Sequence, residues 1–429
     1  MIIKNILSTG AVRMLYALSG FVLLWLATNG MGAAAWGVSG LILLNVTLLI
    51  MLAEMVSNAV VYYSSRRNPK SLIRLSTGFT IALLAFFSLT FFVLSYFPDF
   101  FHLLVPQGYA VHILILVWLG SLHNINLYLL LGRERIRAFN TLFMLQFLSQ
   151  LAAMAIALHL LDIRNELAYV ISLYASYLVP LISAYTTYFV PLLRGNTGLP
   201  DANLREMIAF GSLTQTSSFV HMLNRRLSFY VIRFFTGNAA LGVFNSGVQL
   251  TEGFRLIGHS IALVQFSSIS NSSDPEYARR LSIRLMKLSI ILTFLALAVL
   301  LLVPDGVFEW LFSREFGQIK LVVAGLAPGV LALSANAIFS HYFSGTGRPK
   351  YNLFASLTGF FIVVPALLLL IPPFGIFGAA LAASLAYIAS ASYQAIVFTR
   401  LNNTTLGEWL PGREEIDVLR QLVKKVMNY

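Results

Sequence analysis

The chain contains no cysteine, so disulfides, thiolate metal sites and cysteine nucleophiles are excluded from any account of its function. It is also poor in charge, because only 11% of its 429 residues are charged while 58% are hydrophobic. Its seven histidines are scattered and lack the HExxH spacing of a zinc site. Together with a mean hydropathy of +0.79, this composition predicts an integral membrane protein.

Uncharged runs of about 20 residues recur along the chain, and each is long enough to span a bilayer as a helix. Two runs, 14–53 and 351–399, are long enough for two helices, broken at Asn29-Gly30 and at residues 371–375. The predicted fold class is therefore an all-α membrane protein with twelve transmembrane helices. These lie near residues 11–29, 37–63, 74–97, 108–132, 138–161, 167–193, 206–235, 239–270, 282–304, 320–344, 351–371 and 376–400.

Lysine and arginine collect in alternate connections between these predicted helices. The net charge of +12 would suggest nucleic acid in a soluble protein, but here the basic residues lie at the ends of apolar segments. By the positive-inside rule, this pattern places both termini in the cytoplasm, and no nucleic-acid partner is expected. The predicted outer connections keep only four basic residues, Arg164, Arg233, Arg314 and Lys320.

Two pairs of similar sequence motifs predict how the helices are grouped. The motif Gly32-Ala33-Ala34-Ala35-Trp36-Gly37-Val38 opens the second predicted helix, and Gly237-Asn238-Ala239-Ala240-Leu241-Gly242-Val243 opens the eighth. A second pair of similar motifs, Gly132-Arg133 and Gly347-Arg348, is also separated by six predicted helices. We therefore expect two six-helix bundles, 1–194 and 206–400, joined by a cytoplasmic linker, 195–205. The tail, 401–429, is expected to carry a short amphipathic helix on the inner membrane surface.

The seventh and eighth predicted helices carry charges where the rest of the chain has few. Each charge is expected to cost about 2.5–3.5 kcal/mol at a bilayer centre, or roughly 10 kcal/mol for four. At 1.5 Å per residue from their outer ends, Arg225 lies about 16 Å deep and Glu252 about 20 Å deep, so they can meet near the midplane. His221 and Arg225 share one helix face, as do Glu252, Arg255 and His259, whereas Arg226 projects about 100° from Arg225.

Two interpretations of this charged centre remain open. Arg225 and Glu252 form an ion pair that holds two helices together, or the arginines form a cationic site for an anionic ligand, with Glu252 orienting one of them. Three arginines against one glutamate favour the cationic site, because a simple pair would be balanced. The candidate substrate-binding residues are His221, Arg225, Arg226, Arg255 and His259, with Glu252 as the charge-orienting residue.

Glu54 is the corresponding candidate in the first half of the chain. It lies about two-thirds along the second predicted helix, with no counter-charge next to it in sequence. A carboxylate in this position can bind a proton or Na⁺ and couple transport to an ion gradient. We expect no metal site and no other cofactor.

Several motifs resemble those of a known family. They are Leu223-Asn224-Arg225-Arg226-Leu227, Gly345-Thr346-Gly347-Arg348-Pro349-Lys350, and Ile371-Pro372-Pro373-Phe374-Gly375-Ile376-Phe377-Gly378-Ala379-Ala380, together with the motif that begins at Gly237. In this layout the chain is similar to the polysaccharide (O-antigen, Wzx-type) flippases of the multidrug/oligosaccharidyl-lipid/polysaccharide (MOP) exporter superfamily.

The resemblance implies a V-shaped twelve-helix transporter of the bacterial inner membrane. It implies a substrate, undecaprenyl-pyrophosphate-linked oligosaccharide for polysaccharide or lipopolysaccharide assembly, which is moved from the cytoplasmic to the periplasmic leaflet. The partners implied are this lipid-linked oligosaccharide, membrane lipids and other glycan-assembly proteins. Many relatives carry Asp where this chain has Ser228. Because this chain lacks that carboxylate, Glu252 and Glu54 are the carboxylates expected to have a functional role.

Two alternative functions were weighed. A drug/cation antiporter of the same superfamily is expected to have an acidic cavity, and three membrane arginines argue against it. A membrane polymerase or ligase of the same glycan pathway is expected to carry catalytic residues on a large outer loop. The predicted outer loops are too short for that, so we expect a transporter and not an enzyme.

Overall fold

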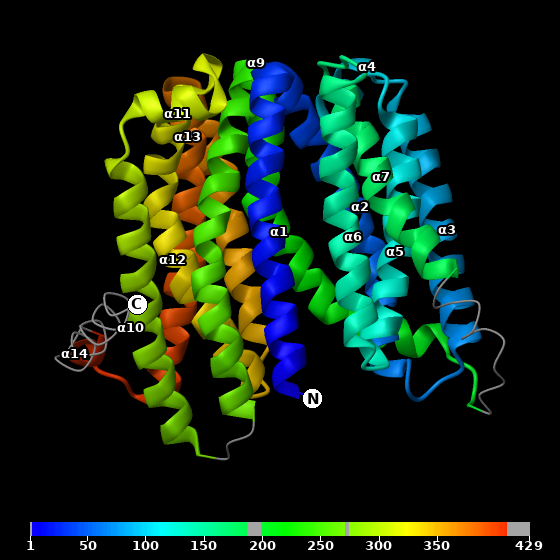
Figure 1. Ribbon diagram of the computed structural model, residues 1–429. Coiled ribbons are helices and arrows are strands. Elements are labelled where there is room, and N and C mark those ends of the chain that lie inside the picture. The colour runs from blue at the N-terminus through cyan, green and yellow to red at the C-terminus, as the bar shows by residue number, and fades with distance from the viewer. Residues whose placement is uncertain (1, 187–198, 271–273, 410–429) are drawn as a thin grey trace. The chain divides into compact units, whose positions relative to one another are not determined.

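The computed structural model describes residues 2–186, 199–270 and 274–409, and within them all regular structure is helical (Figure 1). The all-α fold class is confirmed. The α-helices are α1 Ile2–Gly30, α2 Gly32–Tyr63, α3 Pro69–Leu94, α4 Pro98–Leu104, α5 Ala110–Gly132, α6 Ile136–His159, α7 Glu166–Ala184, α9 Leu204–Ser270, α10 Pro275–Leu302, α11 Asp305–Phe312, α12 Ile319–Gly345, α13 Lys350–Asn402 and α14 Leu406–Trp409, and a 3₁₀ turn, η2, covers Arg314–Phe316.

Two of these helices each cover two predicted spans. Gly237 interrupts α9 with φ 86° and ψ −177°, and Gly375 interrupts α13 with φ 53° and ψ −132°. Glycine adopts these positive φ values without a Cβ clash, so both breaks lie where the sequence predicted them. Because the described residues also contain the short helices α4, α11 and α14, the structure shows 13 α-helices, and the count of twelve stays a prediction.

Polar side chains at the predicted inner and outer ends determine where several helices begin. Asn68 accepts a hydrogen bond from the Lys70 backbone and precedes a proline, the residue best tolerated in the first turn, so α3 begins there. Asn165 caps α7 and Asp274 caps α10 in the same way. These caps satisfy backbone N–H groups that have no partner inside the helix.

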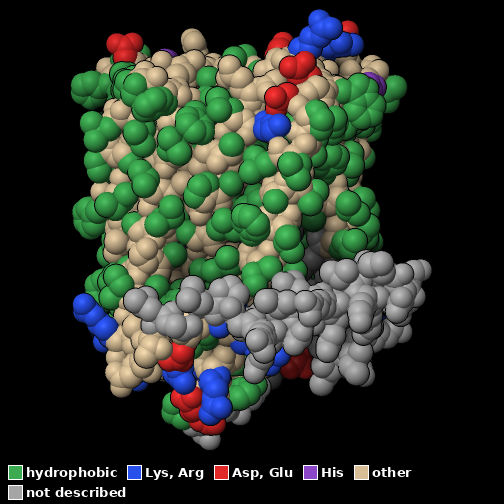
Figure 2. All heavy atoms as spheres, turned by 90° about the vertical axis from the view of Figure 1, so that its left-hand side faces the viewer, with side chains coloured by type: hydrophobic (Ala, Val, Ile, Leu, Met, Phe, Trp, Pro, Cys, Tyr) green, Lys and Arg blue, Asp and Glu red, His purple; other side chains and the backbone are tan. Residues whose placement is uncertain are grey.

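The described helices have the length and composition of membrane spans. Nine of them are long and apolar enough to cross a membrane, and α1 contributes the shorter apolar stretch Met14–Gly30. On the face drawn in Figure 2, charged side chains gather toward the two ends while hydrophobic side chains cover the band between them. The chain is therefore a multi-pass membrane protein.

The described helices form two compact units. Unit 1 contains 1–222 together with Ile232–Asn245 and Trp310–Phe316, and unit 2 contains Leu223–Val231, Ser246–Glu309 and the chain from Gly317 onward. Unit 1 thus includes two segments from the second half of the chain, whereas unit 2 contains none from the first half. The predicted division into bundles 1–194 and 206–400 stays a prediction. The predicted linker lies partly, and the predicted tail helix wholly, outside the described residues.

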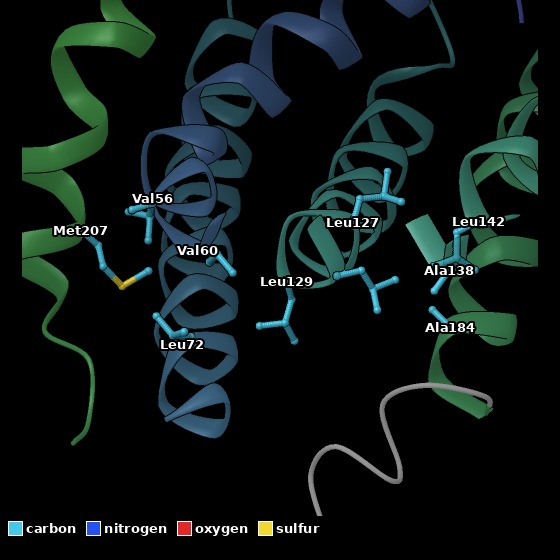
Figure 3. Packing of buried hydrophobic residues seen from close by; sticks show 11 residues of the cluster. Val56, Val60, Leu72, Leu127, Leu129, Ala138, Leu142, Ala184 and Met207 are labelled. Atoms are coloured by element: carbon cyan, nitrogen blue, oxygen red, sulfur yellow. The ribbon is translucent and has the colours of Figure 1, made fainter. Parts of the chain in front are cut away.

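Each unit has its own hydrophobic core. In unit 1, side chains from α2, α3, α5, α6, α7 and α9 pack together, including Val56, Leu72, Leu129 and Met207 (Figure 3). In unit 2, α9, α10, α12 and α13 contribute a second cluster around Phe343. Cores of interdigitated side chains resist deformation, so each unit is expected to move largely as a body.

The predicted topology has a direct test, because an introduced cysteine is the only thiol in this chain. Lys70 and Asp162 are both exposed and lie at connections predicted to face opposite sides. Lys70→Cys should react with a membrane-impermeant maleimide only from the cytoplasm, and Asp162→Cys only from outside. Labelling of both from the same side would contradict the predicted orientation.

Candidate functional site

Unit 2 contains a cluster of charged side chains on α9. Arg225 Nη2 and Arg226 Nη2 donate to the same oxygen of Glu252, Oε1, at 2.5 and 2.7 Å. In a continuous helix, residues 27 positions apart would be about 40 Å apart. The hydrogen bonds form because the chain reverses at Gly237, which brings the two halves of α9 together.

This cluster is not balanced in charge. Arg255 is half-buried, and its buried Nε has no hydrogen-bond partner among the described residues. Arg225, Arg226 and Arg255 carry three positive charges against one negative charge on Glu252, which leaves a net charge of +2. Two uncompensated charges within a membrane-spanning segment cost several kcal/mol, about 2.5–3.5 kcal/mol each at a bilayer centre.

The structure places the arginines closer together than helix geometry alone suggested. Arg226 projects away from Arg225 on the helix, yet the two guanidinium groups reach the same carboxylate because arginine side chains are long and flexible. Their side chains are only 13% and 14% exposed, and Glu252 is 30% exposed. The pairing of Glu252 with two arginines fits the interpretation as an ion pair that holds helices together. The third arginine is in excess, and it fits the interpretation as a cationic site.

The two histidines predicted for this site lie on either side of the charged residues in sequence. His221 and His259 are both half-buried. The ring of His259 lies 5.5 Å from that of His341 on α12, and the His341 Nδ1–H donates to the Ala337 carbonyl at 2.8 Å. The sequence does not single out His341, because nothing in it indicates which residue of α12 meets the face of α9 that carries Arg255 and His259.

Glu54 forms a second polar centre, within unit 1. Its Oε1 accepts hydrogen bonds from Asn124 Nδ2 at 2.9 Å and from the Tyr128 hydroxyl at 2.8 Å. Gln215 Nε2 lies 3.4 Å from Oε2, and Asn58 Nδ2 donates to Gln215 Oε1 at 2.7 Å. Residues of α2, α5 and α9 therefore meet around one carboxylate.

Every described partner of Glu54 is a neutral donor. No arginine, lysine or histidine pairs with it in the described part of the chain. A carboxylate held by neutral amides and a phenol, without a permanent counter-charge, is suited to exchange a proton or a small cation. The same described residues contain no group of three or more His, Asp or Glu side chains that could hold a metal ion.

Comparisons with known proteins bear on the family and the fold of the chain. A family model described as "Polysaccharide biosynthesis protein" matches residues 109–321, slightly less than half of the chain. The solved structure of the lipid II flippase MurJ, in an inward closed conformation, is similar at a TM-score of 0.74 and 15% identity, covering 94% of this chain and 89% of that one.

Solved transporters of the MOP superfamily have the same fold. An inward-facing multidrug resistance (MATE) transporter of this superfamily matches with TM-score 0.70 and 15% identity over 94% of this chain and 99% of its own. The chain has the fold of the MOP superfamily. The predicted resemblance is thereby confirmed at the level of fold.

A third MOP transporter, from Pyrococcus furiosus, matches with TM-score 0.55 and 14% identity over 94% of this chain and 95% of its own. That transporter is described as having a binding pocket of reverse polarity, which suggests a different function for it. No curated protein matches this chain in sequence.

Ser228 marks where this MOP-fold chain departs from the pattern of the flippases it resembles. The side chain is 1% exposed, and its hydroxyl has no hydrogen-bond partner among the described residues. A neutral hydroxyl provides no negative charge for the nearby arginines, whereas an aspartate would. Glu252 is therefore the carboxylate that the described residues provide for the arginine cluster.

Sequence reasoning missed the neutral partners of Glu54. Asn124 and Tyr128 are spaced i, i+4 on α5, and Gln215 lies near the start of α9. A search for charged residues does not single them out. The one available signal was the spacing of polar residues within otherwise apolar helices.

Proposed function

We propose that the chain is a flippase for an anionic, lipid-linked oligosaccharide, moved across the bacterial inner membrane by alternating access. The observation that carries this proposal is the net charge of +2 on the cluster of Arg225, Arg226, Arg255 and Glu252. A site that retains excess cations at a cost to stability is suited to a ligand that supplies the missing negative charge. A pyrophosphate linker or an acidic sugar has that chemistry.

The residues of the cluster have different proposed roles in binding the substrate. Glu252 holds Arg225 and Arg226 in fixed positions, which lowers the entropy lost when their remaining donors meet a ligand. The buried Nε–H of Arg255 has no partner among the described residues, so it remains an unsatisfied donor. Guanidinium groups bind phosphate oxygens through paired N–H donors, so this arrangement favours pyrophosphate over a neutral lipid. We place the substrate's charged linker at this cluster.

Transport against a gradient requires coupling, and we assign that role to Glu54. It is half-buried, accepts hydrogen bonds from neutral donors and has no described ion-pair partner. Protonation or Na⁺ binding at this carboxylate would change the charge of unit 1 without touching the arginine cluster. Our proposal thus separates the driving ion, at Glu54, from the substrate at the arginines.

A drug/cation antiporter is the second candidate function, and it is favoured by one observation. Glu54 is an uncompensated carboxylate that a cationic drug could neutralise. The arginine cluster opposes this function, because a positive site repels cations. The two functions therefore differ in the charge of the substrate, which is negative for the flippase and positive for the antiporter.

A reconstituted assay tests the proposal. Purified protein in liposomes should move a fluorescent undecaprenyl-pyrophosphate oligosaccharide between leaflets, measured by quenching with an impermeant reductant. Protein-free liposomes and a cationic dye serve as controls. Movement of the dye without movement of the glycolipid would establish the antiporter instead.

A further inference from the structure

The helix that carries Glu54 and the half of α9 that carries His259 begin in the same way. Each begins at a glycine with positive φ, Gly32 at 79° and Gly237 at 86°. Glu54 and His259 each lie 22 residues after that glycine, or about 33 Å along the helix at 1.5 Å per residue. The similar motifs therefore precede a titratable side chain at the same position, once in unit 1 and once in unit 2.

The contacts between the two motifs, which both lie in unit 1, support this register. A Cβ at Gly37 would lie 2.0 Å from the Asn238 carbonyl oxygen, and one at Gly242 would lie 1.9 Å from the Ala33 carbonyl oxygen. In the register of the two opening glycines, these contacts join the same two positions of each helix. Such reciprocal contacts are the pattern that related by a two-fold axis equivalent segments make.

Glu54 and His259 also meet equivalent helices. Glu54 accepts hydrogen bonds from Asn124 and Tyr128 of α5. The ring of His259 lies 5.5 Å from the ring of His341 on α12. Both α5 and α12 lead into one of the two Gly-Arg motifs of the sequence. His341 lies six residues before its motif, and the same position of α5 falls between the two donors to Glu54.

The hydrogen bond of His341 determines which of its nitrogens can take up a proton. Its Nδ1–H donates to the Ala337 carbonyl at 2.8 Å, so in the neutral ring Nε2 carries the lone pair. The carbonyl accepts this hydrogen bond from the neutral and from the charged ring alike. His341 can therefore bind a proton at Nε2 without losing its partner, and imidazole is the side chain that changes charge between about pH 5 and 8.

The surroundings of the two histidines are rich in positive charge. His259 follows Arg255 by four residues on α9, a spacing that places the two Cβ atoms about 6 Å apart. The helices packed here carry six charged or titratable groups about two to five turns from their predicted inner ends, namely Glu252 and Arg255 on α9, Arg284 and Lys287 on α10, and Tyr387 and Tyr393 on α13. The one carboxylate among these six, Glu252, pairs with arginines.

We propose that His259 and His341 form a proton-binding site, the counterpart in unit 2 of Glu54 in unit 1, and that its proton strengthens the binding of an anionic linker at the arginine cluster. Two charged rings this close repel each other, so the pair binds a single proton. That proton raises the charge beside Arg255 from +2 to +3. The effect on the linker rests on the proposed function, whereas the proton site does not.

Binding of inorganic pyrophosphate to the purified protein in detergent tests the effect on the ligand. The dissociation constant of His341→Gln divided by that of the wild type should rise about tenfold between pH 8 and pH 6, or about 1.4 kcal/mol, as expected for one charge about 10 Å from the ligand. This ratio cancels the protonation of pyrophosphate itself. His159→Gln, at an exposed histidine of unit 1, is the matched control and should bind as the wild type does at both pH values.

A variant with a fixed charge gives a second comparison. His341→Lys should bind pyrophosphate as tightly as the wild type at pH 6 and about tenfold more tightly at pH 8. This comparison still decides the question if His341→Gln does not fold, which the melting temperature of each variant reports. Ratios that stay constant between the two pH values, for either variant, would overturn the effect on the ligand.

Histidine NMR tests the proton site without any ligand. In protein labelled with ¹⁵N-histidine, the signals of His259 and His341, assigned from the variants, should shift together between pH 5 and pH 8. His341→Gln should change the midpoint of the His259 titration, because the two rings share one proton. Signals that do not shift, or a His259 midpoint that is unchanged in His341→Gln, would overturn the pair.

The two measurements separate this site from the proposed function. If the two histidines titrate together but the wild type binds no pyrophosphate at either pH, the proposed substrate is wrong and the proton site stands. If pyrophosphate binds to the wild type and neither histidine titrates, the arginine site stands and the proton site is wrong.

Discussion

Replacing Arg255 by alanine is expected to reduce glycolipid transport by about 10- to 150-fold, the effect of losing one hydrogen bond to a charged group worth about 1.5–3 kcal/mol. The same change should leave thermal stability unchanged or raise it. Arg255 has no described ion-pair partner, and its removal lowers the charge of the cluster from +2 to +1. Transport rates in liposomes and the melting temperature in detergent measure the two effects.

Glu252→Ala, in contrast, is expected to lower thermal stability as well as transport. This change leaves three arginines without a carboxylate, and breaking a fully buried pair costs about 3–5 kcal/mol. The loss here should be smaller than that, because the Glu252 side chain is 30% exposed. Arg284→Ala, at an exposed arginine of α10, is the matched control and should change neither transport nor stability.

A combined variant tests whether the arginines bind a ligand or only hold two helices together. Because Glu252 pairs with both Arg225 and Arg226, removing Glu252 and Arg225 still leaves Arg226 unpaired. The triple change Arg225→Ala/Arg226→Ala/Glu252→Ala removes the whole paired group and should recover most of the stability lost in Glu252→Ala. If transport recovers as well, the arginines serve only to hold helices together and the ligand site is refuted.

Much of the fold was predictable, because membrane helices follow local rules. Length and hydropathy located the long helices, and glycine located the breaks in α9 and α13 at Gly237 and Gly375. The short helices α4, α11 and α14 were missed, since each has fewer than nine residues and depends on contacts made elsewhere. The inclusion of 232–245 and 310–316 in unit 1 also depends on contacts between segments far apart in sequence, which local patterns do not specify.

The candidate sites were predictable only where charge was involved. Arg225, Glu252 and Glu54 stood out because a charge in an apolar run is costly and needs a reason. Asn124, Tyr128 and His341 did not stand out, since neutral polar residues are common in membrane helices. The hydrogen bonds from Asn29 to Leu311 and from Ala33 to Glu315 join residues 282 positions apart, which no local pattern specifies.

Glu54→Gln is expected to remove the dependence of transport on an ion gradient while leaving expression and folding intact. The glutamine amide is nearly isosteric and its oxygen can still accept from Asn124 and Tyr128, but it cannot gain or lose a proton and binds Na⁺ weakly. With a pH gradient and a Na⁺ gradient imposed in turn, the wild type should respond to one of them at least tenfold more strongly than the variant, a difference of about 1.4 kcal/mol or more.

Two further variants distinguish a role of Glu54 in ion coupling from a role in helix packing. Glu134→Gln, at an exposed glutamate between α5 and α6, should retain the gradient response. Glu54→Asp keeps the charge but shortens the reach to Tyr128 and Gln215, so it should retain a weakened response to the same ion. If Glu54→Gln responds to the gradient as the wild type does, the carboxylate serves only to join α2, α5 and α9, and the driving ion binds elsewhere.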